Sequence, residues 1–285
     1  NYVVAGGMES MTNAPYLLKK HRSGARLGHD TAYDHMFLDG LEDAYEEGRA
    51  MGTFAQQTAN DYQLTREQMD DYSIESLRRA NAAIESGAFS GEVVPVTFST
   101  RAGEQTVDTD EAPGKGKPDK IPQLRPAFAK DGTITAATSS SISDGAAAVV
   151  LSRESVAKEN GQEPVAKIVA LAAHAQEPSE FTVAPVGAIE KVLKSAGWSA
   201  DEVDLWEVNE AFACVAMFAM RDIGIPHDKI NVNGGGTALG HPIGASGTRI
   251  IVTLLNALKQ QGKKRGVASL CIGGGEATAV AVELA

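Results

Sequence analysis

The chain has 285 residues, a formal net charge of −11, and 43% hydrophobic and 22% charged residues. This length is sufficient for one large domain or two medium ones with a sizeable buried core. The negative charge argues against nucleic acid and membrane surfaces as partners, because both are polyanionic. No apolar run approaches the roughly 18 residues of a membrane span, and no export signal is visible at the N-terminus. We therefore expect a cytoplasmic protein that binds neither nucleic acid nor membrane.

The cysteine and histidine residues form no recognisable disulfide or metal pattern. Cys214 and Cys271 lie far apart in the sequence and make neither a disulfide framework nor a metal motif. His21, His29 and His35 have a spacing that fits no compact metal site, and nothing nearby supplies cysteine or paired carboxylate ligands. We therefore expect no bound metal, a reducing environment for the thiols, and a surface position for these three histidines.

The first half of the chain mixes irregular stretches with helices that have clear boundary signals. The box TREQ at residues 65–68 can satisfy the first amides of a helix, and Gly87 is placed to end that helix. The Pro, Gly and Lys residues of 108–132 predict a long functional or flexible loop. Further helices are expected over 39–51 and 53–62, and strands over 2–5, 93–98 and 105–107.

In the second half, apolar strands alternate with helical patterns, and a capping box occupies residues 199–202. This alternation implies a layered α/β domain around a central sheet. Asn209, His241 and Cys271 all fall at or just beyond strand ends, where ligands usually bind in such sheets. Helices are expected over 152–160, 185–197, 211–223 and 245–261, strands over 165–172, 203–208, 230–233, 266–271 and 278–284, and a buried strand or helix segment over 146–151.

A glycine-rich stretch surrounds one histidine, His241. The stretch 231–249 contains six glycines but lacks the Lys-Ser/Thr of a phosphate-binding P-loop and the pattern G-x-G-x-x-G, so it does not support a nucleotide site. His241 lies between Gly240 and Pro242, which restrict the backbone on both sides. An imidazole held in this way can be a neutral hydrogen-bond donor or a proton acceptor. The alternative is a buried histidine that only satisfies a backbone carbonyl.

A second glycine-rich turn follows Cys271 at the end of an apolar strand. Gly273, Gly274 and Gly275 allow backbone amides to approach a ligand closely. A thiol titrates close enough to neutrality to move protons if its surroundings lower its pKa. The alternative is an inert core cysteine, which is how we interpret Cys214 inside the apolar helix AFACVAMFAM.

Three segments, in this order and at these spacings, resemble the C-terminal signatures of the thiolases, the family of acetyl-CoA C-acetyltransferases and 3-ketoacyl-CoA thiolases. They are NEAFA at 209–213, GHPIGASG at 240–247 and CIGGG at 271–275. VAGGMESM at 4–11 is similar to the thiolase segment that leads into the loop domain. The resemblance covers essentially the whole chain. The cysteine at the last site favours thiolases over the related ketoacyl synthases, which place a second histidine there.

The resemblance implies an α/β protein with the layered α-β-α thiolase fold, comprising an incomplete N-terminal half, a complete C-terminal half and an inserted loop domain. The implied N-terminal domain comprises 1–16 and 133–163, the CoA-binding loop domain 17–132, and the C-terminal domain 164–285. CoA thioesters are the expected substrates, with no tightly bound cofactor, and the expected assembly is a homodimer or homotetramer. The chain opens in mid-strand without an initiator Met, so we expect an N-terminally truncated thiolase without the family's upstream nucleophilic cysteine.

By the same resemblance, Cys271 deprotonates the methyl group of the attacking acetyl-CoA and protonates the leaving group. His241 would activate the nucleophilic cysteine and donate to the thioester oxygen, and Asn209 would hold a water that completes this first oxyanion hole. The amide of Gly273 would form half of a second oxyanion hole around the acyl-enzyme carbonyl. Ser140 is expected to contact the pantetheine of CoA. The other residues expected along the pantetheine path are Met51, Phe128, Ala211 and Phe212.

These roles predict an acetyl-CoA C-acetyltransferase that cleaves or forms acetoacetyl-CoA through an acyl-cysteine. One alternative is a degradative 3-ketoacyl-CoA thiolase for longer chains, because Ala50 stands where the family often has His. The other is a non-catalytic acyl-CoA-binding protein of thiolase-like fold. A local basic stretch would either face the phosphates of CoA or form a solvated loop. It contains Lys115, Lys117, Lys120, Arg125 and Lys130.

Overall fold

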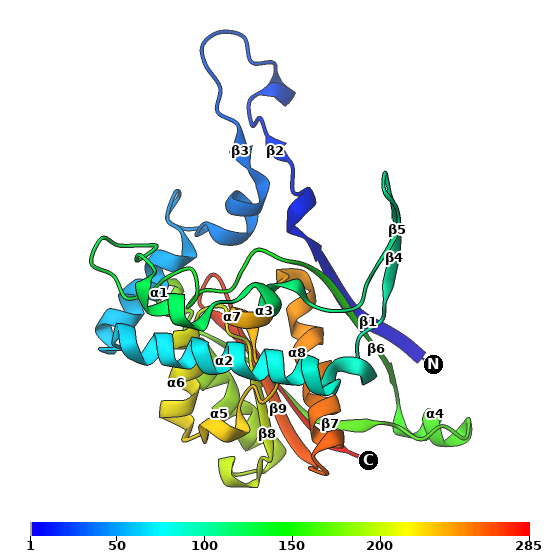
Figure 1. Ribbon diagram of the computed structural model, residues 1–285. Helices are drawn as coiled ribbons and strands as arrows, with labels where there is room; N and C mark the ends of the chain where they lie inside the picture. The colour runs from blue at the N-terminus through cyan, green and yellow to red at the C-terminus, as the bar shows by residue number, and fades with distance from the viewer. Residues whose placement is uncertain (1) are drawn as a thin grey trace.

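A four-stranded sheet organises the C-terminal half of the protein, as the computed structural model of residues 2–285 shows (Figure 1). Its strand order is β7-β10-β9-β8. β10 (Glu276–Leu284) runs antiparallel to both β7 (Ala166–Ala175) and β9 (Arg265–Ile272), whereas β8 (Leu205–Val208) runs parallel to β9. Four of the five strands expected in this half are therefore confirmed, namely those over 165–172, 203–208, 266–271 and 278–284. The parallel pair brings the carboxyl ends of β8 and β9 to the same edge.

Helices cover both faces of this sheet. Successive residues of each strand point to opposite faces, so a strand with apolar residues in succession contributes to a core on each side. On β10, Ala279 and Ala281 pack in a core with α5 (Ala184–Ala196) and α6 (Ala213–Ile223), while Val280 and Val282 pack on α8 (Ile243–Gln260). α8 directs a stripe of apolar side chains at the sheet with helical spacing. They are Ile250, Leu254, Ala257 and Leu258. The expected layered α/β architecture is confirmed.

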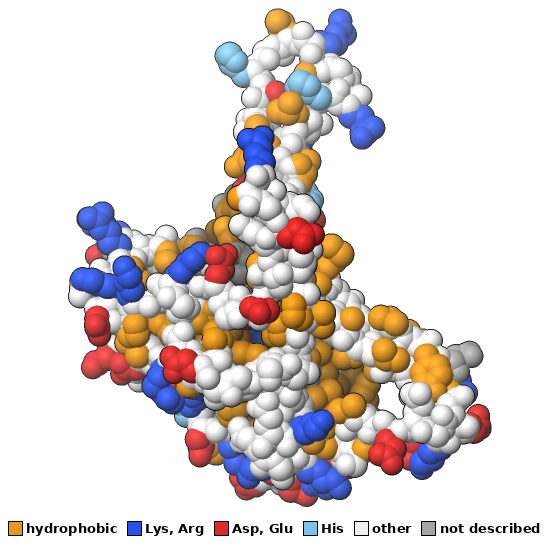
Figure 2. Space-filling view, turned by 45° about the vertical axis from the view of Figure 1, so that its right-hand side comes forward, with side chains coloured by type: hydrophobic (Ala, Val, Ile, Leu, Met, Phe, Trp, Pro, Cys, Tyr) orange, Lys and Arg blue, Asp and Glu red, His pale blue; other side chains and the backbone are white. Residues whose placement is uncertain are grey.

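The N-terminal strand β1 (Tyr2–Ser10) pairs with β6 (Asp144–Ser152) in an antiparallel ladder that lies against α8. The strand expected over 2–5 therefore continues through Gly6 and Gly7 to Ser10. A Cβ on Gly7 would collide with the carbonyl of Gly244 in α8, so this glycine allows strand and helix to approach closely. β1 and β6 expose apolar side chains, including Val4, Met8 and Val150. Figure 2 shows hydrophobic side chains gathered on the surface below the projecting arm.

Two helices lie between these strands in sequence. α1 (Met51–Asp61) and α2 (Arg66–Ser86) match the expected positions, and both hydrogen bonds of the capping box at Thr65 and Gln68 are present. Gly87 ends α2 in the left-handed conformation with φ 73°. Short helical turns also occupy the expected loop 108–132, namely α3 (Glu111–Lys115) and a 3₁₀ turn over Pro118–Gln123.

Two expected elements are wrong. In place of the helix expected over 39–51 there is a single π turn, Phe37–Leu41. After it, the carboxylate of Asp43 accepts hydrogen bonds from the amides of Tyr45 and Glu46, and these bonds compete with helix formation. The strand expected over 230–233 is an isolated bridge between Trp206 and Ile230, because Asn231 adopts a left-handed conformation with φ 46°.

The remaining elements lie at the periphery. β2 (Tyr16–Leu17) and β3 (Tyr33–Asp34) form the base of a long arm at the top of Figure 1, and β4 (Val96–Thr100) and β5 (Gly103–Val107) form a projecting hairpin. α4 (Glu154–Glu159) follows β6, and α7 (Gly236–Leu239) precedes α8.

Neither a metal cluster nor a membrane helix is found within residues 2–285. No group of three or more His, Cys, Asp or Glu side chains in this range could hold a metal ion. His21 and His29 are exposed, as expected, and His35 is half-buried. None of the helices in the described range is long and apolar enough to cross a membrane.

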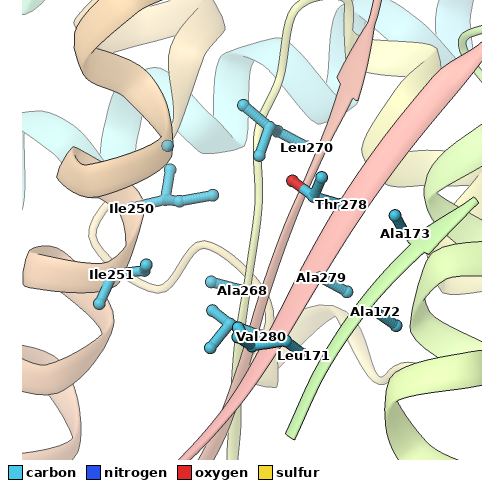
Figure 3. A pocket seen from close by; sticks show the side chains of 11 residues that line it. Leu171, Ala172, Ala173, Ile250, Ile251, Ala268, Leu270, Thr278, Ala279 and Val280 are labelled. Carbon is cyan, nitrogen blue, oxygen red and sulfur yellow. The ribbon is translucent and has the colours of Figure 1, made fainter. Parts of the chain in front are cut away.

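An apolar groove of about 530 Å³ lies between α8 and the sheet (Figure 3). Ile250 and Ile251 of α8 face Leu270 of β9 and the side chains of β10 and β7 across it. None of the residues predicted to take part in catalysis or CoA binding lines this groove. The predicted site therefore lies elsewhere, at the carboxyl ends of β8 and β9.

Candidate active site

Asn209 and His241 meet in the structure although 32 residues separate them. Asn209 follows β8 directly, and its backbone N–H donates to the carbonyl of Ser269 on β9 over 2.9 Å. Its side chain is almost completely buried, and its amide nitrogen lies 3.3 Å from His241 Nε2. The geometry thus joins the first and second of the three sequence motifs.

The hydrogen bonds around His241 define its tautomer. Its Nδ1 lies 2.6 Å from Ser246 Oγ, and that hydroxyl donates its single proton to the carbonyl of Pro242 over 2.9 Å. Ser246 must therefore accept from Nδ1–H, which leaves Nε2 unprotonated and able to accept from the Asn209 amide. His241 thus directs the lone pair of Nε2 toward the Asn209 amide.

Burial keeps this imidazole neutral. The loss of hydration lowers the pKa of His241 from its ordinary value of 6.5 to about 4, and the positive charge of Arg249 acts in the same direction. At neutral pH the group is therefore a base rather than a cation. A neutral base with a fixed tautomer is suited to accept a proton from a thiol.

Cys271 lies near the end of β9, opposite Ala277 of β10, and is 6% exposed. Burial raises the pKa of its thiol to about 12. The surroundings therefore do not lower this pKa in the protein without substrate, because desolvation disfavours the thiolate. Cys271 is consequently protonated at neutral pH and prepared to donate a proton. Cys214 is fully buried in α6, and its core position is confirmed.

The turn after Cys271 brings two predicted residues together. Gly274 and Gly275 have φ values of 104° and 96°, a conformation that favours glycine. A Cβ added to Gly273 would lie 3.0 Å from the sulfur of Met51, at the start of α1. The predicted oxyanion-hole glycine therefore lies directly beside a residue predicted to line the pantetheine path.

Aromatic side chains extend this wall. Phe128 packs so closely on α1 that a Cβ on Gly52 would collide with its ring. The ring centroids of Phe128 and Phe212 are 6.0 Å apart in an edge-to-face arrangement. Four of the predicted substrate residues thus lie near one another. They are Met51, Phe128, Phe212 and its neighbour Ala211.

The segment 138–143 connects this wall to His241. The backbone amide of Ser140 donates to the carbonyl of Ala211 over 3.0 Å. The backbone amide of His241 donates to the carbonyl of Ser141 over the longer distance of 3.4 Å. A Cβ on Gly240 would collide with the hydroxyl of Ser143. Ser140 is therefore held between the NEAFA and GHPIGASG motifs, although no sequence pattern indicated this contact.

Sequence reasoning missed Ser246, whose hydroxyl orients His241. A signal was available, since Ser246 lies five residues after the histidine, in the same glycine-rich motif and in the first turn of a helix.

The predicted basic stretch lies on the surface of the protein. All five of its Lys and Arg residues are exposed, and Lys115 pairs with Glu111. Its proximity to CoA phosphates stays a prediction.

Comparison with known proteins agrees with these motifs. The family model of the thiolase N-terminal domain matches residues 1–155, and that of the thiolase C-terminal domain matches residues 162–284. The chain belongs to the thiolase family. Its thiolase-like fold is supported by the crystal structure of Bacillus anthracis acetyl-CoA acetyltransferase, which matches with a TM-score of 0.95 and 40% identity, over 100% of this chain and 72% of that chain.

Two further thiolase relatives are informative. A probable acetyl-CoA acetyltransferase of Dictyostelium discoideum is 48% identical over 282 residues, covering 99% of this chain and 68% of the relative. The Acat5 thiolase of Ascaris suum, whose crystal structure was solved in complex with coenzyme A, is 43% identical with a TM-score of 0.92. That match covers 100% of this chain and 72% of the other.

The depressed pKa of His241 predicts that acid weakens the fold. Between pH 6.5 and 4 the unfolded chain binds a proton at this position that the folded chain does not, so stability falls as the pH drops through this window. In denaturant titrations, the free energy of unfolding of the wild type should fall by about 2 kcal/mol more than that of His241→Gln between pH 7.5 and pH 5. The exposed His29→Gln variant should behave like wild type. Equal losses in wild type and His241→Gln would contradict the assignment.

The raised pKa of Cys271 predicts an unreactive thiol. Because the thiolate is the nucleophile, iodoacetamide at pH 8 should modify Cys271 roughly a thousandfold more slowly than a free cysteine, as measured by peptide mass spectrometry. A Ser90→Cys variant, with its thiol at an exposed position, provides the reference rate in the same protein. Modification of Cys271 at the rate of this reference would show that the thiol is not protected.

Proposed function

We propose that this thiolase acts as an acetyl-CoA C-acetyltransferase, which cleaves acetoacetyl-CoA or condenses two acetyl groups. Two observations carry the proposal: a neutral His241, whose Nε2 lies 3.3 Å from the side-chain amide of Asn209 after β8, and a protonated Cys271 on β9, the strand that pairs with β8. The relatives named acetyl-CoA acetyltransferase support acetyl-CoA as the substrate, and the Ascaris thiolase supports a CoA site.

In the first half-reaction, His241 Nε2 takes the proton of a nucleophilic cysteine thiol, and the sulfur attacks the thioester carbonyl. The protonated Nε2–H then donates to the developing oxyanion, together with a water held by Asn209. Collapse of the tetrahedral intermediate then breaks one bond. With a 3-ketoacyl-CoA it is the carbon–carbon bond, and with acetyl-CoA it is the bond between the acetyl group and the sulfur of CoA. The acyl group remains on the cysteine.

Cys271 moves the other proton. In cleavage, its thiol protonates the carbanion that leaves as acetyl-CoA, and the raised pKa keeps that proton on the sulfur until it is needed. In condensation, the thiol of Cys271 first protonates the CoA thiolate that leaves in the first half-reaction. The resulting Cys271 thiolate removes a proton from the methyl group of a second acetyl-CoA, and the carbanion attacks the acyl-cysteine. Collapse of this intermediate breaks the bond to the nucleophilic sulfur, releases acetoacetyl-CoA and returns the proton held by His241 to that sulfur. The Gly273 amide donates to the oxyanion of that second step.

The acyl-accepting cysteine, in this proposal, is not among the 285 residues. Cys214 is 0% exposed within α6, and Cys271 is used for proton transfer. The supporting residues for the pantetheine are Ser140, Met51, Phe128, Ala211 and Phe212. They form a continuous wall between the two oxyanion donors.

Replacing Cys271 by Ala should abolish proton transfer and spare binding. In the natural protein that carries this sequence, Cys271→Ala should lower kcat for acetoacetyl-CoA cleavage by about a hundredfold to ten-thousandfold. The dissociation constant for CoA, measured calorimetrically, should stay within a factor of about two or three. Cys214→Ala, which removes the core thiol, is the matched control and should keep its activity. Cleavage that survives in Cys271→Ala would exclude the acid/base role.

The 285-residue chain by itself should not accept an acetyl group. After incubation with carbon-13-labelled acetyl-CoA, intact-mass and peptide analysis should show no thioester on Cys214 or Cys271, because one is inaccessible and the other protonated. A stable acetyl thioester on either cysteine, formed at a catalytic rate, would require a different assignment of the nucleophile.

A further inference from the structure

Glu210 carries a fully buried carboxylate next to Asn209, and no step of the proposed reaction uses it. Five hydrogen bonds of 2.6–3.1 Å reach its two oxygens, and none of the donors is charged. The donors to Oε1 are Tyr72 Oη and Asn231 Nδ2, and the donors to Oε2 are Ser76 Oγ, Thr237 N and Thr237 Oγ1.

An isolated buried carboxylate is costly unless hydrogen bonds replace its hydration. Charge-assisted hydrogen bonds supply that replacement, but only while all donors stay in position around the oxygens. The carboxylate therefore restrains the elements that carry its donors. A glutamine of the same shape could accept at one end only, because its amide NH₂ group would face donors at the other.

The donors come from three separate parts of the chain. Tyr72 and Ser76 lie on α2, Asn231 follows the bridge to β8, and Thr237 lies in α7. Asn231 also holds the backbone of Val208 with both ends of its amide, at 2.9 and 2.8 Å. Glu210 thus links the end of β8 to a helix and to the loop before His241.

The loop before His241 is packed against this carboxylate. A Cβ on Gly235 would collide with the carboxyl group of Glu210, and a Cβ on Gly236 would lie 2.8 Å from its backbone carbonyl. The amide of Gly235 also donates to Ser76 Oγ over 3.0 Å. The position of the chain five and six residues before His241 is therefore set by contacts with Glu210 and Ser76.

We propose that Glu210 is a positioning residue that holds the His241 loop against the Asn209 strand end and so maintains the first oxyanion hole. Asn209 is its neighbour in the chain, and Thr237, which it binds through two donors, leads through one short helix to His241. The Asn209–His241 contact of 3.3 Å tolerates little movement, and displacements of about 1 Å at an active site can cost about a hundredfold in rate. The catalytic consequence rests on the proposed thiolase activity, whereas the effect on geometry does not.

The kinetic test uses Glu210→Gln in the natural protein that carries this sequence. We expect kcat for acetoacetyl-CoA cleavage to fall about tenfold to a hundredfold per folded molecule, with KM changed less than about threefold. The matched control is Glu207→Gln on β8, three residues before Glu210, since burial raises the pKa of Glu207 to about 8 and the side chain is mostly uncharged at pH 7. This control should keep kcat within about threefold. An equal loss of kcat in both variants would overturn the proposal.

A double-mutant cycle separates positioning from general destabilisation. If Glu210 acts through the Asn209–His241 pair, then Glu210→Gln should cost less than about threefold in kcat when introduced into Asn209→Ala. Losses that multiply would show that the two residues act independently and would overturn the proposal. Should Glu210→Gln fail to fold, Thr237→Val removes the 2.6 Å bond alone, and the same non-additivity with Asn209→Ala is expected.

A second measurement does not depend on activity. In protein labelled with nitrogen-15 histidine, the His241 ring resonances, assigned with His241→Gln, should report the Nδ1–H tautomer in wild type and Glu207→Gln. They should shift in Glu210→Gln or Thr237→Val. Unchanged resonances would overturn the positioning role whether or not the protein cleaves acetoacetyl-CoA. If the resonances shift in these variants but the wild-type protein does not cleave acetoacetyl-CoA, the proposed function is refuted and the positioning role of Glu210 stands.

Discussion

Burial, rather than ion pairing, sets the protonation states on which this site depends. Loss of hydration lowers the pKa of His241 and raises that of Cys271, so both groups are uncharged at neutral pH. The result is a neutral base and a neutral acid among buried residues, where fixed dipoles act strongly on developing charge. The parallel pairing of β8 with β9 contributes to this arrangement, because it places Asn209, just after β8, and Cys271, near the end of β9, at the same edge of the sheet.

The glycines of the motifs serve two purposes. Gly273 has an amide suited to an oxyanion hole and lies against Met51. Gly235, Gly236 and Gly240 instead allow backbone to pack against Glu210, Asn209 and the serine-rich segment, where a Cβ would not fit. Much of the glycine pattern around His241 therefore reflects close packing that positions the histidine.

Local signals predicted most elements but not the exceptions. The capping box at Thr65 and the left-handed Gly87 define α2 through contacts within a few residues. The failures at 39–51 and 230–233 have a different origin. In the first, Asp43 binds nearby amides instead of allowing a helix, and in the second, Asn231 is held in a left-handed conformation by bonds to Val208 and Glu210. No local pattern contains the partners of Asn231.

The sequence by itself determined the family, the alternation of strands and helices, and the choice of Asn209, His241 and Cys271 as chemically competent residues. Tertiary structure decided their chemical state: the Nδ1–H tautomer selected by Ser246, the protonated thiol of Cys271, and the five donors around Glu210. The physical reason is that secondary structure depends mainly on neighbours in the chain. Hydration and hydrogen-bond partners depend on segments that meet only when the sheet and its covering helices assemble.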